Sequence, residues 1–410
     1  MQALIEPSII SGAVDSPQSK SIAIRLLFSS LLGKMRLENL EFSEDVEAAA
    51  RALSSLGVLK HETGWEAGKL HAGPISVNLG GSGTTLRMLI PVLAYLGIEA
   101  NLDGDETLRR RPLGVLADWL SSNGMKISGD RLPLKIQGRL KTDRVEISGA
   151  ESSQYISGFI FGLLLSGGGK ILLVPPVRSR SYIQMTCDVL NSIGAKIRFQ
   201  ENTIEIQPQE TPLTYVGEVP GDFLLSSFYA LGAILTGGNV IINNLSKREW
   251  SKGDSRIVKL LEETGSVSRF DGSKWVVEGG KQIKPFTEDV DDSPDMAVSL
   301  AALASASEGV STISGVELLR TKESDRLESI TKTLLSFDVV SRTNNGLIIE
   351  GRKTLHRGKV ENWNDHRITM LGTVLSLRSG GVVDGTQSVS KSNPRFFDDL
   401  RKLGGLIELE

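Results

Sequence analysis

Residues 80–97, GGSGTTLRMLIPVLAYLG, form the stretch that decides the fold. A polar, glycine-rich start is followed by the apolar run Leu86–Leu96 and then by Gly97, a residue that favours the end of a helix. A helix that is apolar on nearly all sides offers no face to water, so other elements must surround it. The stretch therefore predicts a fully buried helix.

The same pattern recurs along the whole chain. Five further segments combine a polar start, an apolar helical run and a glycine: Ser16–Gly33, Glu151–Gly168, Pro220–Gly238, Asp292–Gly309 and Asn364–Gly381. The terminal glycines of the six segments are 64, 71, 70, 71 and 72 residues apart. Such a regular period indicates a repeated supersecondary unit.

A second series of helices runs in phase with the first. These amphipathic runs end at Gly57, Gly124, Gly194, Gly265, Asp338 and Gly404. Glycine suits that position because it adopts the left-handed conformation freely. A hairpin pattern follows most of them, for example Ala195–Phe199 and Ile204–Ile206 around a turn. Six units sorted three and three predict two similar α/β domains, with a single solenoid of six units as the alternative.

The composition is that of an ordinary globular protein. The chain has 410 residues, of which 40% are hydrophobic and 23% charged, so two domains with substantial cores are expected. A net charge of −3 argues against nucleic acid or an anionic membrane as a partner. Cys187 is the one cysteine, and the N-terminus shows no signal-peptide pattern. We therefore expect a monomeric cytoplasmic protein without a membrane segment.

The starts of the six buried helices carry the candidate binding residues. Those in the first half offer hydroxyls, amides or cations: Ser16–Ser21 with Arg25, Gly80–Thr85 with Arg87, and Ser152–Gln154. Those in the second half each bring an acid: Gly221-Asp222, Pro294-Asp295 and Asn364–Arg367. N-capping explains any single one of these sites. The division into halves fits better with two domains, one binding anions at helix starts and the other supplying proton-transfer groups.

Other binding motifs fit poorly. The loop at 80–85 lacks the Gly-Lys-Ser/Thr ending of a P-loop and does not match the dinucleotide fingerprint. The histidines show no close metal-ligand spacing; they are His61, His71, His356 and His366. We therefore expect neither a metal nor an organic cofactor.

Two cationic clusters lie in connections between helices. The first, Arg109–Arg111, precedes Pro112 and an amphipathic helix, and such a triplet is usually a solvated face from which one residue can reach a ligand. In the second, Lys322–Arg326, the spacing predicts that Lys322, Glu323 and Arg326 share one helical turn. A surface lattice of ion pairs is the alternative interpretation of that string.

Taken in order, these motifs resemble the 5-enolpyruvylshikimate-3-phosphate synthase family from Ser16 to about Leu400. The matching strings are Ser19-Lys20-Ser21 with Arg25, Ser82–Arg87, Arg111-Pro112, Ser152–Gln154, Ser179 with Tyr182, Gly221-Asp222, Pro294-Asp295, Lys322–Arg326, Asn364–Arg367 and Lys391. Two positions, Gly81 and Leu318, depart from family members that carry Asn there, which bears on affinity rather than on the class of reaction.

The resemblance implies a fold of two domains, each an inside-out α/β barrel of three βαβαββ units around a pseudo-threefold axis. Residues 1–16 and 221–410 would form a discontinuous domain with the acidic groups and part of the phosphoenolpyruvate site. Residues 17–220 would form an inserted domain that binds shikimate 3-phosphate.

The resemblance also implies the site residues. Shikimate 3-phosphate would be held by Lys20, Ser21, Arg25, Ser152, Ser153, Gln154, Ser179, Tyr182, Asp295 and Lys322. Phosphoenolpyruvate would be held by Lys20, Gly83, Arg111, Gln154, Arg326, Arg367 and Lys391. The catalytic set would be Asp295 as base toward the 5-hydroxyl, Glu323 as the acid that protonates C3 of phosphoenolpyruvate, and Lys20 as a proton partner. Two substrates with four anionic groups require many guanidinium and ammonium groups, which agrees with this set.

Two alternatives to this activity are considered. A UDP-N-acetylglucosamine enolpyruvyl transferase shares the fold but typically uses a reactive cysteine on a mobile loop. Cys187 lies instead in a predicted helix, Tyr182–Ile193, where a packed thiol is expected. The second alternative, a non-catalytic anion-binding protein of the same fold, fits poorly with the joint presence of Lys20, Asp295 and Glu323.

Overall fold

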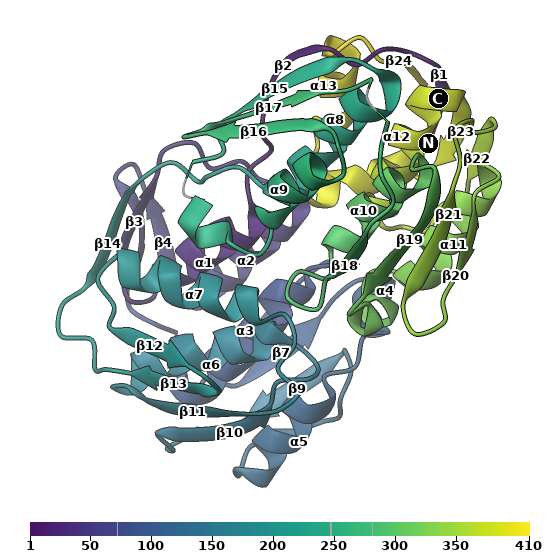
Figure 1. Ribbon diagram of the computed structural model, residues 1–410. Helices are drawn as coiled ribbons and strands as arrows, with labels where there is room; N and C mark the ends of the chain where they lie inside the picture. Colours follow the sequence, from purple (N-terminus) through teal and green to yellow (C-terminus); the bar gives the residue numbers. More distant parts are fainter. Residues whose placement is uncertain (72, 247, 281) are drawn as a thin grey trace. The chain divides into compact units, whose positions relative to one another are not determined.

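The computed structural model describes residues 1–71, 73–246, 248–280 and 282–410 (Figure 1). Its contacts divide the chain into two compact units. Unit 1 consists of Met1–Ser19 and Pro220–Glu410, and unit 2 is the inserted segment Lys20–Val219. The chain therefore passes between units at residues 19–20 and 219–220, where the sequence predicted crossings near 17 and 221. Across the described ranges, every helix is too short or too polar to cross a membrane.

Unit 2 is built from three four-stranded sheets with the orders β14-β3-β5-β4, β6-β7-β9-β8 and β10-β11-β13-β12. Its strands are β3 (Gly33–Leu37), β4 (Val58–His61), β5 (Gly64–Ala67), β6 (Ile75–Asn78), β7 (Ala100–Asp103), β8 (Lys126–Ile127), β9 (Leu134–Gln137), β10 (Arg144–Ser148), β11 (Gly169–Val174), β12 (Ile197–Gln200), β13 (Thr203–Ile206) and β14 (Leu213–Gly217). Its helices are α1 (Lys20–Ser29), α2 (Glu44–Ser55), α3 (Gly83–Leu96), α4 (Glu106–Arg109), α5 (Gly114–Ser122), α6 (Ser153–Ser166) and α7 (Arg180–Ser192).

Unit 1 repeats the design with the sheet orders β16-β17-β15-β2, β18-β19-β21-β20 and β22-β23-β1-β24. Its strands are β1 (Gln2–Glu6), β2 (Gly12–Asp15), β15 (Asn239–Asn243), β16 (Val267–Asp271), β17 (Lys274–Glu278), β18 (Thr287–Asp289), β19 (Gly309–Ser314), β20 (Val340–Arg342), β21 (Leu347–Gly351), β22 (Gly358–Val360), β23 (Gly381–Asp384) and β24 (Leu406–Leu409). Its helices are α8 (Phe223–Thr236), α9 (Arg256–Glu263), α10 (Met296–Ser305), α11 (Arg326–Ser336), α12 (His366–Ser379) and α13 (Phe396–Lys402), with 3-10 turns η1 (Arg248–Ser251), η2 (Glu317–Thr321) and η3 (Thr386–Lys391).

All six sheets share one pairing pattern. One outer pair of strands is parallel, as in β10 with β11 or β18 with β19, and the remaining neighbours are antiparallel. A parallel pair requires a crossover connection, and a buried helix such as α6 or α10 provides it. The predicted α/β class is therefore confirmed, and the predicted hairpins appear as β12–β13 and β20–β21.

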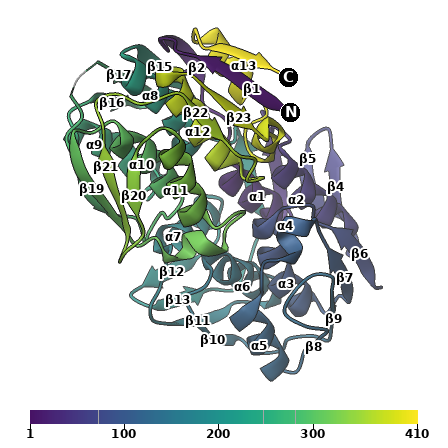
Figure 2. The ribbon, with the colours of Figure 1, turned by 90° about the vertical axis from the view of Figure 1, so that its right-hand side faces the viewer.

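Three sheets are completed by segments far away in sequence. Strand β14 pairs with β3, and β2 pairs with β15 across the inserted unit. Strand β1 lies between β23 and β24, so both ends of the chain belong to one sheet (Figure 2). The sequence repeat could not reveal these pairings, because the periodic segments are helices and the closing strands come from outside the period.

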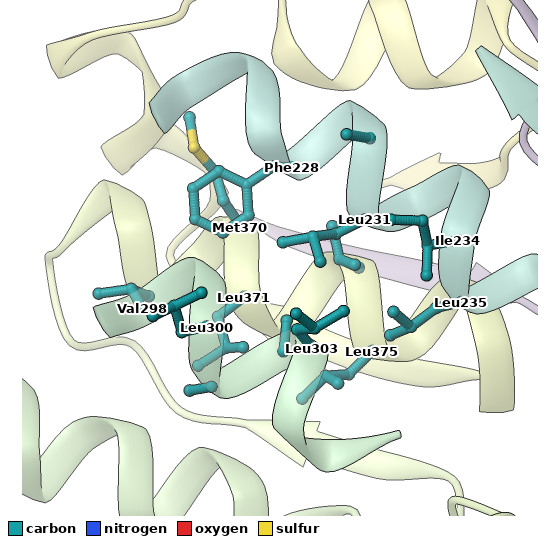
Figure 3. Close-up of a cluster of buried hydrophobic side chains, with 14 of the residues drawn as sticks. Phe228, Leu231, Ile234, Leu235, Val298, Leu300, Leu303, Met370, Leu371 and Leu375 are labelled. Atoms are coloured by element: carbon teal, nitrogen blue, oxygen red, sulfur yellow. The ribbon is translucent and has the colours of Figure 1, made fainter. Parts of the chain in front are cut away.

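The apolar helices form the centre of each unit, as predicted. All ten residues of α10 are buried, and in α8 the run Phe223–Leu235 is buried without interruption. Side chains of α8, α10 and α12 meet in one hydrophobic cluster (Figure 3). In unit 2, α3 and α6 approach closely because Gly158 and Gly162 lack side chains; a Cβ on Gly162 would lie 2.3 Å from the ring of Tyr95.

The glycines of the two helix series have different roles. Every residue that ends a helix of the second series has a positive φ, including Asp338 at 65°, so the predicted left-handed ends are confirmed. In the first series the left-handed cap of α6 and α8 is the preceding glycine, Gly167 or Gly237. The periodic Gly238 is required for a different reason: a Cβ there would lie 2.0 Å from the backbone oxygen of Ile10.

Candidate active site

The helix starts of unit 2 hold most of the predicted substrate residues. Lys20 and Ser21 begin α1, Gly83 begins α3, and Ser152 caps α6 before Ser153 and Gln154. Ser179 precedes α7 without a capping hydrogen bond from its side chain, Tyr182 lies in the first turn of α7, and Arg111 lies between α4 and α5. Ser152 Oγ accepts a hydrogen bond from Gln154 N at 3.3 Å, so N-capping accounts for part of its role.

Two guanidinium groups converge on Gly83 at the start of α3. A Cβ on Gly83 would lie 2.8 Å from Arg111 Nη1 and 2.9 Å from Arg87 Nη1. Arg87 Nη1 donates to Gln154 Oε1 at 3.3 Å, and Gln154 Nε2 donates to Thr84 Oγ1 at 2.7 Å, which ties the starts of α3 and α6 together. Two guanidinium groups beside the positive end of a helix form an environment that suits a phosphate or carboxylate.

The three arginines of the triplet have different neighbours. Arg109 pairs with Asp103 at 2.7 Å, and Arg110 pairs with Glu106 at 3.0 Å, both at the surface. Arg111 is half-buried and turns toward Gly83. Two members therefore form a solvated face, and the third lies beside the start of α3.

Lys20 has a partner that the sequence analysis did not identify. Its ammonium nitrogen lies 2.6 Å from Asp45 Oδ2, and both side chains are largely buried. Asp45 sits in the first turn of α2 beside Glu44, and acids there are expected to complement the helix dipole. Nothing in the local pattern indicated that it would pair with a residue 25 positions earlier.

Arg25 lies in the interior of unit 2, only 2% exposed. It donates to Ser21 O at 2.8 Å and to Tyr182 O at 3.1 Å. Three of the predicted shikimate 3-phosphate residues, on α1 and α7, are therefore joined by hydrogen bonds.

The predicted residues of unit 1 form one ionic network. It comprises Asp295, Lys322, Glu323, Arg326, Arg367 and Lys391, together with Asp365 and His366. Asp295 Oδ1 lies 3.0 Å from Lys322 Nζ and 2.9 Å from Arg326 Nη1. Arg367 Nε lies 3.6 Å from Asp295 Oδ2.

Arg326 is a buried centre of this network rather than part of a surface lattice. It is 2% exposed and binds Asp365 through Nε at 2.8 Å and Nη2 at 3.0 Å. The prediction that Lys322–Arg326 forms one helical turn is wrong. Asp325 caps α11 by accepting from Leu327 N at 3.1 Å, so the helix begins only at Arg326 and the preceding residues are not helical.

Glu323 contacts three basic groups. Its Oε2 lies 2.9 Å from His366 Nδ1 and 3.8 Å from Lys391 Nζ, and its Oε1 lies 3.8 Å from Arg326 Nη2. Lys391 also donates to Asn364 O at 3.0 Å. The side chain of Glu323 is 11% exposed, so solvent screens these interactions weakly.

The network holds Asp295 as a carboxylate. Burial opposes its ionisation, but the charges of Lys322, Arg326 and Arg367 outweigh burial and hold the pKa of Asp295 well below its usual range. Burial lowers the pKa of Lys322, and Asp295 counteracts this only in part. Burial likewise opposes ionisation of Asp365, yet Arg326 keeps the pKa of that carboxyl below its ordinary value.

Arg87 and Arg367 have buried donor atoms that lack a hydrogen-bond partner in the described part of the chain. Within the ranges that the structure describes, Arg87 Nε, Arg367 Nε and Arg367 Nη1 have no hydrogen-bond partner. A buried donor left without a partner is unfavourable unless a ligand satisfies it, and a charged donor favours an anion.

The acids at the helix starts of unit 1 are not equivalent. Asp222 accepts from Leu224 N at 3.0 Å and Leu225 N at 2.9 Å, so it is an ordinary cap. Asp295 makes no capping hydrogen bond, and its carboxylate turns to the cations instead. The capping interpretation therefore holds for Asp222 and fails for Asp295.

Cys187 is a packed thiol. It is 1% exposed, and burial raises its pKa to about 12. A nucleophilic cysteine must be accessible and readily ionised. This chain therefore does not offer the reactive cysteine expected of the UDP-N-acetylglucosamine alternative.

The fold is that of a two-unit α/β protein with mixed sheets, and one of the units carries the ionic network. An EPSP synthase from Acinetobacter baumannii matches the structure with a TM-score of 0.79 over 99% of both chains. The two sequences are 24% identical, so this likeness shows the fold.

The chain belongs to the EPSP synthase (3-phosphoshikimate 1-carboxyvinyltransferase) family, whose model matches residues 5–400. A protein named 3-phosphoshikimate 1-carboxyvinyltransferase from Saccharolobus islandicus (strain M.14.25 / Kamchatka #1) is 44% identical over 99% of each chain. Proteins of the same name are 42% identical in Sulfurisphaera tokodaii and 36% identical in Caldivirga maquilingensis, each over 98% of both chains. The chain is an enzyme of this family.

Four residues that contact predicted site residues were themselves absent from the predicted site: Asp45, Arg87, Asp365 and His366. Three of them stand within quoted motifs, so their position was known but their partners were not. Asp45 had no sequence signal beyond an acid in a first helical turn.

Proposed function

We propose that the enzyme transfers the carboxyvinyl group of phosphoenolpyruvate to the 5-hydroxyl of shikimate 3-phosphate and releases phosphate. The observation that carries the proposal is the network in which Asp295 and Glu323 stand among Lys322, Arg326 and Lys391. Two carboxylates beside several cations combine proton transfer with anion binding, which this reaction needs at the same place.

The first step is an addition. Glu323 gives a proton to C3 of phosphoenolpyruvate, C2 becomes cationic in character, and the 5-hydroxyl oxygen forms a bond to C2. Asp295 receives the proton of that hydroxyl. Because the cations keep Asp295 ionised, it is always ready to accept a hydrogen bond from the hydroxyl. Its low pKa makes it a weak base, so the proton moves only as the new bond makes the hydroxyl acidic.

The second step is an elimination from the tetrahedral intermediate. The bond between C2 and the phosphate oxygen breaks, the methyl group formed at C3 returns a proton to the Glu323 carboxylate left by the first step, and inorganic phosphate leaves. Lys20 serves as a proton partner for the leaving phosphate or the hydroxyl. No metal or organic cofactor takes part in either step.

The anionic groups of the substrates are assigned to the cations. Phosphoenolpyruvate would contact Lys20, Gly83, Arg111, Gln154, Arg326, Arg367 and Lys391, and the buried donors of Arg367 support an anion there. Shikimate 3-phosphate would contact Lys20, Ser21, Arg25, Ser152, Ser153, Gln154, Ser179, Tyr182, Asp295 and Lys322. The proposal includes that the enzyme is a monomer and acts in the cytoplasm. A single buried cysteine suits that reducing compartment.

The test is phosphate release from phosphoenolpyruvate by the purified protein. We expect release only when shikimate 3-phosphate is present, with a new carboxyvinyl ether as the organic product. Release supported by UDP-N-acetylglucosamine would reject the substrate assignment. No release with either acceptor, from protein that unfolds cooperatively, would favour the non-catalytic alternative.

A further inference from the structure

A buried hydroxyl pair joins three helices of unit 2. Thr186 on α7 and Ser157 on α6 are both 0% exposed, and their hydroxyl oxygens lie 2.7 Å apart. Arg25 Nε on α1 donates to Thr186 Oγ1 at 2.8 Å. The three side chains therefore form one polar contact inside an otherwise apolar interior.

The hydroxyl pair also contacts the backbone beneath the proposed substrate residues. Thr186 Oγ1 donates to Tyr182 O at 3.1 Å, and Ser157 Oγ lies 3.1 Å from Ser153 O. With Ser157 as donor, Thr186 accepts two hydrogen bonds and donates one, which uses its full capacity. The first turn of α7 is thereby tied to the guanidinium of Arg25, and α6 joins through the Ser157 hydroxyl, whose one hydrogen is then not available to Ser153 O.

From this geometry we infer that Thr186 is a positioning residue for the shikimate 3-phosphate site. This inference rests on the proposed function. Thr186 does not act on the substrate. Its hydroxyl fixes the rotamer of Arg25 and the position of the first turn of α7, which carries Tyr182. Its removal would leave a charged, buried N–H of Arg25 without its acceptor, so the guanidinium would move to find another.

The test is Thr186→Val, which keeps the shape of the side chain and removes the hydroxyl. We expect the KM for shikimate 3-phosphate to rise about tenfold, while kcat and the KM for phosphoenolpyruvate change less than about threefold. Thr186→Ser restores the hydroxyl and should return the KM to within about twofold of the wild type. A purely structural loss would not show this selectivity or this rescue.

Thr373→Val is the matched control. Thr373 is also 0% exposed, and its hydroxyl donates to Thr369 O within its own helix α12 at 2.8 Å. Thr373→Val should leave the KM for shikimate 3-phosphate and the KM for phosphoenolpyruvate unchanged.

Equal increases in both constants for Thr186→Val, no increase, or no rescue by serine would overturn the inference. If the valine variant does not fold, Ser157→Ala is the test. A rise of about threefold in the KM for shikimate 3-phosphate alone supports the inference, and an unchanged KM rejects it. Absence of activity in the wild type would reject the proposed function itself.

Discussion

The charged residues around Gly83 in unit 2 and those of the unit 1 network have different partners. In unit 2 the guanidinium of Arg87 is bonded to the neutral amide of Gln154, and Arg111 points at the same glycine. In unit 1 the cations alternate with carboxylates, so that Arg326 contacts Asp295, Glu323 and Asp365. In unit 2 the amide that Arg87 contacts is neutral, whereas in unit 1 the cations hold the pKa of Asp295 and of Asp365 below their ordinary values.

The difference shows that one repeated fold carries two kinds of charged cluster. A helix start provides N–H donors in both units, but the side chains around it decide whether an anion or a proton is handled there. In unit 2, the Lys20–Asp45 pair shows that this division is not complete. The comparison predicts that replacing the acids of unit 1 changes turnover and stability. Adding a side chain at Gly83 in unit 2 should instead change the affinity for an anionic substrate.

The largest effect is expected for Glu323→Gln. Loss of the proton donor should lower kcat by about 10²–10⁴-fold and leave the affinity for shikimate 3-phosphate nearly unchanged. Steady-state kinetics and equilibrium binding measure the two quantities separately. Glu328→Gln, an exposed site on α11 paired with Lys332, serves as control and should retain activity. Parallel losses of turnover and binding would contradict the assignment of Glu323 as the acid.

Asp295→Asn should destabilise the protein in a pH-dependent way. It removes the counter-charge of Lys322 and one of the carboxylates that face Arg326, which keeps Asp365 and Glu323, at a cost of roughly 1–3 kcal/mol of unfolding free energy at pH 7. The pKa of Asp295 is depressed by folding, so its contribution is complete above the unfolded pKa of about 4 and is lost as pH falls through the folded value.

Denaturant unfolding of both proteins at pH 7, 5 and 3 checks this prediction. The difference in unfolding free energy between wild type and variant should be constant from pH 7 to 5 and should become smaller on further acidification. Asp118→Asn, exposed on α5, is the control. A difference in unfolding free energy that grows toward pH 3 would mean that the cations do not stabilise the Asp295 carboxylate.

Gly83→Ala should affect phosphoenolpyruvate selectively. The added Cβ displaces the guanidinium ends of Arg111 and Arg87, which lie within 3 Å of it, so the KM for phosphoenolpyruvate should rise about tenfold. Gly73→Ala is the control, because the nearest atom to its Cβ is 3.8 Å away. An unchanged KM would show that the two guanidiniums do not bind this substrate.

The smallest effect is expected for Cys187→Ala. The buried thiol with its raised pKa takes no part in the proposed reaction, so kcat should stay within about twofold of the wild type. Turnover measured before and after treatment with a thiol reagent gives a second check. Complete loss of activity in a folded variant would reopen the cysteine-dependent alternative.

Local patterns were reliable where one physical reason dominates. The end of each second-series helix needs a positive φ, and even Asp338 adopts it. The buried helices followed from their lack of a polar face, as the complete burial of α10 shows. The Lys322–Arg326 string was misjudged because i,i+4 spacing indicates a helical turn only if the residues are helical, and the cap at Asp325 prevents this.

By itself, the sequence determined the repeat, the buried helices and the helix starts at which the charged residues cluster, because these depend on periodicity and local backbone preference. Only the tertiary structure decided which strands close the sheets, that Lys20 pairs with Asp45, and that Arg326 lies between Asp295 and Asp365. Those outcomes depend on contacts between distant segments, and the protonation of a buried carboxylate follows from the charges that folding brings beside it.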